Sequence, residues 1–312
     1  MHQHSSSPQE PPHSHMCLRK KRKHHLTMLT LLLFFTCAIA WFIGSHIVRG
    51  SAEAPPPSLP MHTAMDEPMQ YQATVQTFTF SQLAAISNDY LLLVNPYYAV
   101  PDYVAGSLVR LAGYVNSLNP DMLLNEDALV MLRAMFDSAT TVGFSQFRVT
   151  QSFRTHEYQQ SLYDQFAGTG IAAQPGHSEH QVGLAVDISY EGVNIGNSVQ
   201  GNWLMNNSYR YGFILRYPQH KTYVTGVPFE PWHYRFVGQP HAYFMTHNDM
   251  VMEEYIEYLS IAREITVIFE GVEFTIFYLD DESEAIDIPI GHQFWASRDN
   301  TGGIIVTVTN SN

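Results

Sequence analysis

One stretch organises the chain, Ser178-Glu179-His180-Gln181-Val182-Gly183-Leu184-Ala185-Val186-Asp187. It places an imidazole and a carboxylate seven residues apart in apolar surroundings. Further along, Glu230-Pro231-Trp232-His233 adds a second imidazole with a carboxylate three positions before it. Two histidines and one acid form a ligand set for zinc, and the remaining acid is then free to act on a water molecule at the metal.

The types of residue in these two segments predict how the roles are divided. Zinc accepts neutral imidazole nitrogen and carboxylate oxygen, and catalytic zinc sites keep a fourth position for water. We therefore expect His180, Asp187 and His233 to hold Zn²⁺, and Glu230 to take a proton from water during its attack. The Pro-Trp pair between Glu230 and His233 indicates a turn or an extended segment, which differs from the helical His-Glu-x-x-His arrangement.

Arg154 is the candidate for a fixed cation at this site. It follows a strand expected at 147–150 and precedes a helix that Thr155 is expected to cap, so it lies at a strand-to-helix junction. Attack on an amide carbonyl creates an oxyanion, and a guanidinium group stays charged and offers its donors in a rigid fork. We expect Arg154 to stabilise that charge.

Each candidate also has a structural alternative. His177 competes with His180 as a metal ligand, and Asp187 is equally suited to capping a strand or turn. The alternative for Arg154 is a surface cation paired with an acid. Trp232 and Tyr234 are interpreted as core residues, because aromatic side chains are more often buried in the core than in contact with substrate.

Charge and cysteine content exclude several classes of function. The formal net charge is −13, and five of the sixteen basic residues lie in Arg19–Lys23. With that pentapeptide and Glu10 set aside, 11 basic residues face 28 acidic ones from Arg49 onward. So acidic a segment argues against nucleic acid as a partner. The only cysteines are Cys17 and Cys37, so cysteine catalysis and Cys-ligated zinc are excluded after residue 48.

The N-terminal part predicts a membrane anchor. Residues 1–25 have the composition of a disordered cytoplasmic tail, and 26–48 form an uncharged apolar run about as long as a spanning helix, for which roughly 20 residues are needed. The basic residues before the run predict that the remainder lies outside the membrane. The competing interpretation is a signal peptide cleaved at Ala38-Ile39-Ala40 or Ala52-Glu53-Ala54. Residues 49–70 are a Pro-rich linker.

The globular part is divided into two regions. We assign 71–262 to the domain that carries the zinc-ligand candidates and 263–312 to a small all-β module. The periodicity predicts these elements: a buried strand or an extended segment at 91–94, a helix from Asn125 to near Gly143, a strand at 182–188, a helix at 202–211, paired strands at 213–215 and 223–226, and a helix at 247–262.

Read together, the segments resemble D-alanyl-D-alanine carboxypeptidases of the VanY type, which are zinc peptidases of the wider LAS group. The matches to the two family motifs are Ser178, His180, Gly183, Ala185 and Asp187, and then Glu230, Pro231, Trp232, His233, Arg235, Val237 and Gly238. The resemblance implies a compact α+β domain that has an antiparallel sheet flanked by helices. It further implies that Zn²⁺ is held by the same three ligands, with Glu230 as base and Arg154 polarising the scissile carbonyl. It also implies that Ser178 and Gln159 lie close to the substrate.

The substrate implied by the resemblance is the peptidoglycan stem peptide, cut before its terminal D-alanine. Two alternatives within the same group are an L,D-carboxypeptidase and a peptidoglycan endopeptidase. A different class of protein, a catalytically inactive wall-binding protein that acts through its β module, is a further alternative. The complete set of His180, Asp187, Glu230 and His233 argues against it.

Overall fold

The computed structural model describes residues 74–102, 106–191, 195–196 and 198–310. These residues belong to one compact unit, Gln70–Asn312. The expected tail at 1–25, anchor at 26–48 and linker at 49–70 lie outside the described residues. Within the described part of the chain, no helix is long and apolar enough to cross a membrane.

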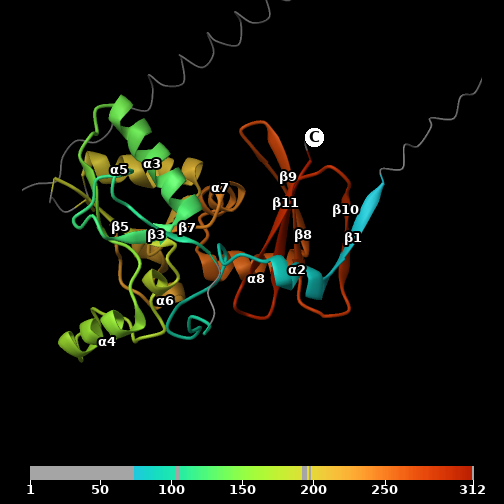
Figure 1. Ribbon diagram of the computed structural model, residues 1–312, viewed down its shortest axis with the longest axis horizontal. Helices are drawn as coiled ribbons and strands as arrows, with labels where there is room; N and C mark the ends of the chain where they lie inside the picture. Colours follow the sequence, from blue (N-terminus) through green and yellow to red (C-terminus); the bar gives the residue numbers. More distant parts are fainter. Residues whose placement is uncertain (1–73, 103–105, 192–194, 197, 311–312) are drawn as a thin grey trace, which may run out of the picture. The chain divides into compact units, whose positions relative to one another are not determined.

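A four-stranded antiparallel sheet forms the centre of the peptidase domain (Figure 1). Its order is β4 (Phe147–Gln151), β5 (Ala185–Tyr190), β7 (His233–Phe236) and β6 (Phe213–Leu215). All four residues of β7 are buried, as expected for a strand with neighbours on both sides. The sheet confirms the expectation of an antiparallel sheet flanked by helices.

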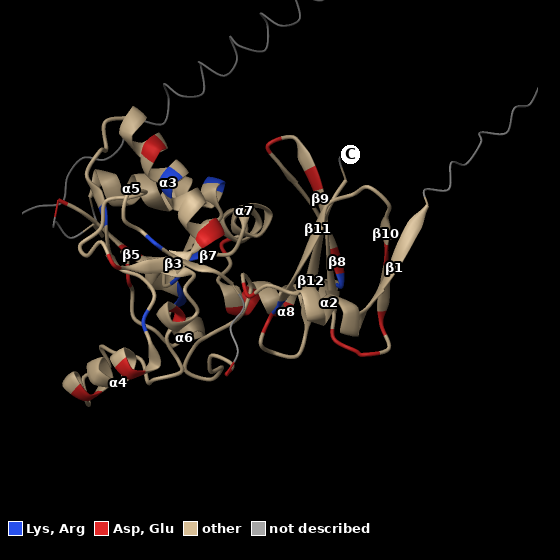
Figure 2. Ribbon diagram, in the orientation of Figure 1, with Lys and Arg blue, Asp and Glu red and all other residues tan. Residues whose placement is uncertain are grey.

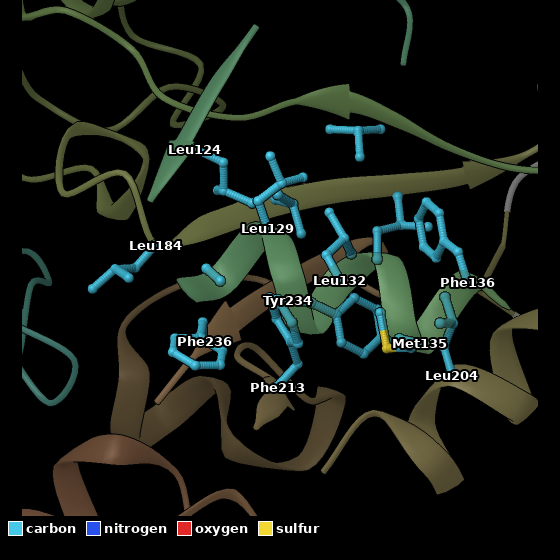
Figure 3. Packing of buried hydrophobic residues seen from close by; sticks show 14 of the residues in the cluster. Leu124, Leu129, Leu132, Met135, Phe136, Leu184, Leu204, Phe213, Tyr234 and Phe236 are labelled. Atoms are coloured by element: carbon cyan, nitrogen blue, oxygen red, sulfur yellow. The ribbon is translucent and has the colours of Figure 1, made fainter. Parts of the chain in front are cut away.

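Helix α3 (Glu126–Thr141) packs its apolar face against this sheet. Asn125 caps the helix by accepting hydrogen bonds from the next turn, and two acidic residues in the first turn favour the helix dipole. Leu129, Leu132 and Met135 are buried in one cluster with Phe213 and Tyr234 (Figure 3). Burying each such side chain stabilises the fold by about 1.5–3 kcal/mol, so this face holds the helix on the sheet.

Shorter elements connect the sheet and complete the domain. They are β2 (Leu108–Arg110), β3 (Leu123–Asn125), α4 (His156–Gln165), η1 (Glu179–Gln181), α5 (Val199–Asn207), η2 (Ser208–Tyr211), η3 (Gln219–Lys221), α6 (Thr222–Thr225), α7 (Gln239–His247) and α8 (Met252–Ala262). The segment at 91–94 is buried without being a strand, which agrees with the expected extended segment. Asp and Glu residues lie along α4 and in loops of the β module (Figure 2).

Two expected elements are wrong. Residues 223–226 were predicted to pair with 213–215, but they lie in α6 and at its left-handed cap Gly226, whose φ is 70°. The strand at 213–215 instead pairs with β7, so its backbone forms hydrogen bonds with that strand and not with 223–226. The helix predicted at 247–262 ends where expected but begins too early, because the chain turns at Asp249 with a φ of 52°, so α8 begins only at Met252 and His247 ends the preceding helix α7.

The all-β module is antiparallel as expected, but its boundary is wrong. Its strands are β8 (Glu264–Phe269), β9 (Val272–Leu279), β10 (Ala285–Pro289), β11 (Phe294–Arg298) and β12 (Ile304–Thr309), which form a four-stranded sheet in the order β11-β12-β9-β8 and leave β10 outside it. β10 pairs with β1 (Val75–Thr79), and Leu83 of the following helix α2 (Phe80–Ile86) is buried in the module core. Residues 75–86 therefore belong to the module.

The module shares a second apolar core with the peptidase domain. Leu91 and Leu93 pack there with residues of α7 and α8 and with Ile276 and Ile305 of the module sheet. The turn between β11 and β12 contacts the same segment, because Asn300 donates from its side-chain amide to the carbonyl oxygens of Leu93 and Ala99 at 2.9 and 2.7 Å. The module is therefore packed against a segment that continues directly into the cleft described next.

Candidate active site

The metal-ligand candidates converge because of the register of two central strands. Asp187 of β5 and His233 of β7 are direct partners across the antiparallel pair, so their side chains project from the same face of the sheet. His180 lies in η1, the single turn that leads into β5. Gly183 makes that turn possible: its φ is 79°, and a Cβ atom there would come within 2.6 Å of the Leu108 side chain.

Three ligand atoms meet at this point. Asp187 Oδ1 lies 3.4 Å from His180 Nε2 and 3.2 Å from His233 Nδ1, and all three ligand atoms lie within 4.8 Å of one another. Two ligands at about 2.1 Å from a tetrahedral Zn²⁺ are about 3.4 Å apart, which matches these separations. Among the described residues, the buried Oδ1 of Asp187 has no hydrogen-bond partner. The residues present therefore fit a zinc ion.

The charge of Asp187 suits a cation ligand. Burial raises the pKa of its carboxyl group, but the neighbouring His180 and His233 outweigh burial and hold the pKa well below its usual range. Burial lowers the pKa of His180, which favours the neutral imidazole that binds metal. The pKa of His233 shifts the other way: burial lowers it, but hydrogen bonds to Asp187 and Glu179 outweigh burial and raise it from 6.5 to about 9, so metal binding at this ring would release a proton.

Glu230 lies at the turn that precedes β7. Its backbone N–H donates to the carbonyl of Tyr217, and its own carbonyl accepts from the N–H of His233 at 3.1 Å, which closes the turn. Its Oε2 lies 3.5 Å from His233 Nδ1, and burial raises the pKa of its carboxyl group. The predicted turn between Glu230 and His233 is confirmed, and the carboxylate lies beside the ligand atoms.

Arg154 occupies the predicted junction between β4 and α4. Its backbone N–H donates to the carbonyl of His180 at 3.0 Å, which ties the junction to the metal-ligand turn. Its guanidinium group lies 3.9 Å from Asp187 Oδ2 and donates to the side-chain oxygens of Gln151 and Gln159 at 3.4 and 3.2 Å. The cation is thus held beside the candidate centre by three side chains.

The two residues expected near the substrate differ in their placement. Ser178 is buried at the wall of the cleft. Gln159 is fully buried and is not among the cleft-lining residues: it accepts from Arg154 and donates to the carbonyl of Ala173 at 2.8 Å. Gln159 therefore holds Arg154 and the 168–176 loop in position.

The structure also decides between the alternative interpretations of His177, Tyr234 and Trp232. His177 Nδ1 donates to the carbonyl of Asn95 at 2.8 Å, and His177 is not part of the metal-ligand group. Tyr234 is completely buried in the core, as interpreted. The same interpretation is wrong for Trp232, which is 38% exposed and lines the cleft, because it belongs to the turn before β7 and not to the strand.

The cleft around these residues has a volume of ≈ 750 Å³. One wall is formed by the segment at 95–96, another by α4 and the 169–174 loop, and a third by residues 226–230. Apolar side chains lie on two of these walls, namely Leu162, Phe166, Ile171, Val227, Pro228, Phe229 and Trp232. The ionisable groups are gathered at the sheet, so the cleft combines an apolar entrance with a polar reaction centre.

A buried charged cluster behind the ligands was missed by the sequence analysis. Glu179 lies 3.3 Å from His233 Nε2 and pairs with Arg216 and Arg235 at 2.7 and 3.0 Å. Burial raises the pKa of Glu179, but the two guanidinium groups outweigh it and hold the pKa well below its usual range. The available signal was an acidic residue directly beside His180 within an otherwise apolar stretch.

Comparisons with known proteins agree with this geometry. A family model described as D-alanyl-D-alanine carboxypeptidase, VanY, matches residues 121–239. A D-alanyl-D-alanine carboxypeptidase of Enterococcus faecium is 33% identical over 226 residues, which cover 70% of this chain and 74% of that protein. The solved structure of the vancomycin resistance D,D-dipeptidase VanXYg, in complex with a D-Ala-D-Ala phosphinate analogue, is 26% identical with a TM-score of 0.67, covering 76% of this chain and 100% of that one. The LdcB LD-carboxypeptidase is 34% identical with a TM-score of 0.50, over 54% of this chain and 86% of that one.

Proposed function

The chain belongs to the VanY family of D-alanyl-D-alanine carboxypeptidases, and from this membership and the site geometry we propose that it is a zinc-dependent D,D-carboxypeptidase of peptidoglycan stem peptides. The observation that carries the proposal is the meeting of Asp187 Oδ1, His180 Nε2 and His233 Nδ1 in the cleft, with the Glu230 carboxylate beside them. The reaction would cleave the amide bond before the terminal D-alanine.

His180, Asp187 and His233 would hold the ion. When bound, Zn²⁺ supplies Lewis-acid chemistry that polarises a carbonyl oxygen and lowers the pKa of water. Glu230 would accept a proton from the attacking water as the new C–O bond forms, and would return it to the amide nitrogen as the C–N bond breaks. Its carboxylate is placed for this by the turn that begins at Glu230 itself.

Arg154 would donate hydrogen bonds to the carbonyl oxygen as negative charge develops there. Fixed donors are most effective when they need no reorganisation during the reaction. Gln151 and Gln159 hold the guanidinium group in place, and Asp187 lies on its other side. Ser178 would contact the substrate at the cleft wall, whereas Gln159 would act through Arg154.

Product analysis tests the proposal against its relatives in the same group. The purified protein with Zn²⁺ is expected to release D-alanine from a stem pentapeptide ending in D-Ala-D-Ala. Release from a tetrapeptide instead would identify an L,D-carboxypeptidase, the activity in the name of the LdcB structure, and cleavage of a cross-linked dimer would identify an endopeptidase. Binding to cell walls with no cleavage of any of these substrates would contradict an enzymatic function.

We further propose that the enzyme acts on the outer side of the cell membrane, held by residues 26–48. The uncharged apolar run and the basic residues before it support this orientation. In fractionated cells, the full chain is expected in the membrane fraction and sensitive to protease added from outside. Recovery of a shortened, freely secreted protein would favour the cleaved signal peptide instead.

A further inference from the structure

The two ring nitrogens of His233 face different carboxylates. Nδ1 lies 3.2 Å from Asp187 and 3.5 Å from Glu230, on the side where the ligand atoms meet. Nε2 lies 3.3 Å from Glu179 Oε2, on the buried side. A neutral imidazole carries one proton, and its other nitrogen offers a lone pair. Without a metal, carboxylates on both sides of the ring can accept its proton. When Nδ1 binds a metal, the proton of the neutral ring is on Nε2, and the ionised Glu179 carboxylate accepts its hydrogen bond.

Glu179 is itself fixed on its other oxygen. Oε1 accepts hydrogen bonds from Arg216 Nε at 2.7 Å and from Arg235 Nη1 at 3.0 Å. All three side chains are completely buried. Two charge-assisted hydrogen bonds in a fully buried site keep the carboxylate ionised and prevent it from turning away from His233.

Both arginines are anchored by further partners. Arg216 forms a two-pronged pair with Glu253 at 2.9 and 2.7 Å, so the cluster contains two acids and two guanidinium groups. Arg235 donates from Nη2 to three backbone carbonyls of the buried segment that precedes the cleft wall, those of Asp89, Tyr90 and Leu92. The orientation of Glu179 is therefore set by a balanced and rigid network.

We propose that Glu179 is a positioning residue of the metal centre, which holds His233 in the Nε2–H tautomer and so presents Nδ1 to Zn²⁺. The inference rests on the zinc-ligand assignment of the proposed function. Carboxylates that orient a metal-ligating histidine in this way usually change metal affinity by about 10–100-fold when they are removed. Glu179 makes this contact from outside the ligand set.

The test compares Glu179→Gln with the matched variant Glu253→Gln. Each removes one negative charge from the partners of Arg216, but only Glu179 contacts His233. In Glu179→Gln, the amide oxygen is expected to keep the place of Oε1, which accepts from both arginines, so the amide NH₂ faces Nε2 and favours the wrong tautomer. The metal-free protein is titrated with Zn²⁺ against a chromogenic chelator, which measures metal affinity without an activity assay.

The expected result is a Zn²⁺ dissociation constant raised about 10–100-fold in Glu179→Gln and less than about threefold in Glu253→Gln. Wild-type affinity in folded Glu179→Gln would overturn the inference, as would equal losses in both variants, because these would reflect charge balance alone. His233→Ala separates this failure from failure of the proposed function. If His233→Ala retains Zn²⁺, the ligand set is wrong, whereas loss in His233→Ala with no change in Glu179→Gln rejects only the role of Glu179.

A measurement on the unaltered protein covers the case in which Glu179→Gln does not fold. The protein is labelled with ¹⁵N-histidine and loaded with ¹¹³Cd²⁺ in place of zinc. We expect the His233 coupling to cadmium at Nδ1 and a proton on Nε2 that exchanges slowly with water. Coupling at Nε2, or an unprotonated Nε2, would overturn the inference.

Discussion

Asp187 and His233 face each other directly across β5 and β7, with Oδ1 and Nδ1 3.2 Å apart. Side chains of such cross-strand partners are held by the hydrogen bonds of the sheet and not by a loop. Only His180 comes from outside a strand, and its turn is tied to Arg154 by a backbone hydrogen bond. Two of the three zinc ligands are therefore preorganised by the register of the sheet.

The division between ligand and base predicts opposite results for two substitutions. Glu230→Gln is expected to bind Zn²⁺ like the wild type while losing about 10²–10⁴-fold in kcat, because it removes the proton acceptor and leaves all three ligands. His180→Ala is expected to lose both Zn²⁺ and activity. Metal analysis of the dialysed proteins, together with D-alanine release, distinguishes them. A zinc content unchanged in His180→Ala would contradict the ligand assignment.

The role of Gln159 predicts an effect on rate with no effect on metal binding. Gln159→Ala removes the side-chain oxygen that accepts a hydrogen bond from Arg154. It also removes the side-chain NH₂ that donates to the carbonyl of Ala173, so Arg154 is expected to become mobile. We expect a loss of about tenfold or more in kcat with the zinc content unchanged, since positioning errors of about 1 Å are costly. Gln160→Ala is the matched control, because its side chain is exposed and bonds only Asp164 within its own helix. Equal rates in the two variants would show that Gln159 does not position Arg154.

The candidate ligands and the candidate base could be named from the sequence, because they lie in two short segments whose residue types are typical of a zinc site, and the structure brings them together. Glu179 lies directly before His180 in the sequence, but its role depends on Arg216 and Arg235, which are 37 and 56 residues further along. No local pattern reports those contacts. Trp232 was misplaced for a related reason, since one residue decides whether a side chain belongs to a strand or to the turn before it.

The fold shows the same limit at long range. Alternation of residue types predicted an all-β module, but the pairing of β1 with β10 joins positions about 210 residues apart, for example Thr77 and Asp287. The helix predicted from residue 247 begins only at Met252, because the chain turns at Asp249. Local periodicity identifies elements, and only tertiary packing decides where they end and with what they pair.

The contact between the β module and the cleft wall predicts that Asn300 contributes to the stability of the fold and to substrate binding. This residue adopts a left-handed φ of 68° and donates to the carbonyls of Leu93 and Ala99. Asn300→Gly keeps the backbone conformation but loses both hydrogen bonds, so we expect a loss of about 1–3 kcal/mol in the free energy of unfolding and a raised KM. Glu270→Gly is the control, because it also has a left-handed φ, of 50°, and makes only a weak exposed ion pair. Chemical denaturation and steady-state kinetics measure both effects, and similar stabilities in the two variants would contradict the prediction.

The buried His241 predicts how stability changes with pH at the packing of the module on α7. Its two nitrogens form hydrogen bonds with the hydroxyls of Tyr255 and Thr307 at 2.7 and 2.9 Å, and burial lowers its pKa from 6.5 to about 3. Between these values the unfolded chain binds a proton that the folded chain does not, so stability falls as the pH is lowered. The contribution of His241 to the free energy of unfolding is expected to decrease by about 1.4 kcal/mol per pH unit below 6.5 and to be constant above it. Denaturation curves between pH 7.5 and about 5 measure the slope, and His241→Gln, which cannot be protonated, should lose this part of it. An identical slope in His241→Gln would show that His241 is not the group responsible.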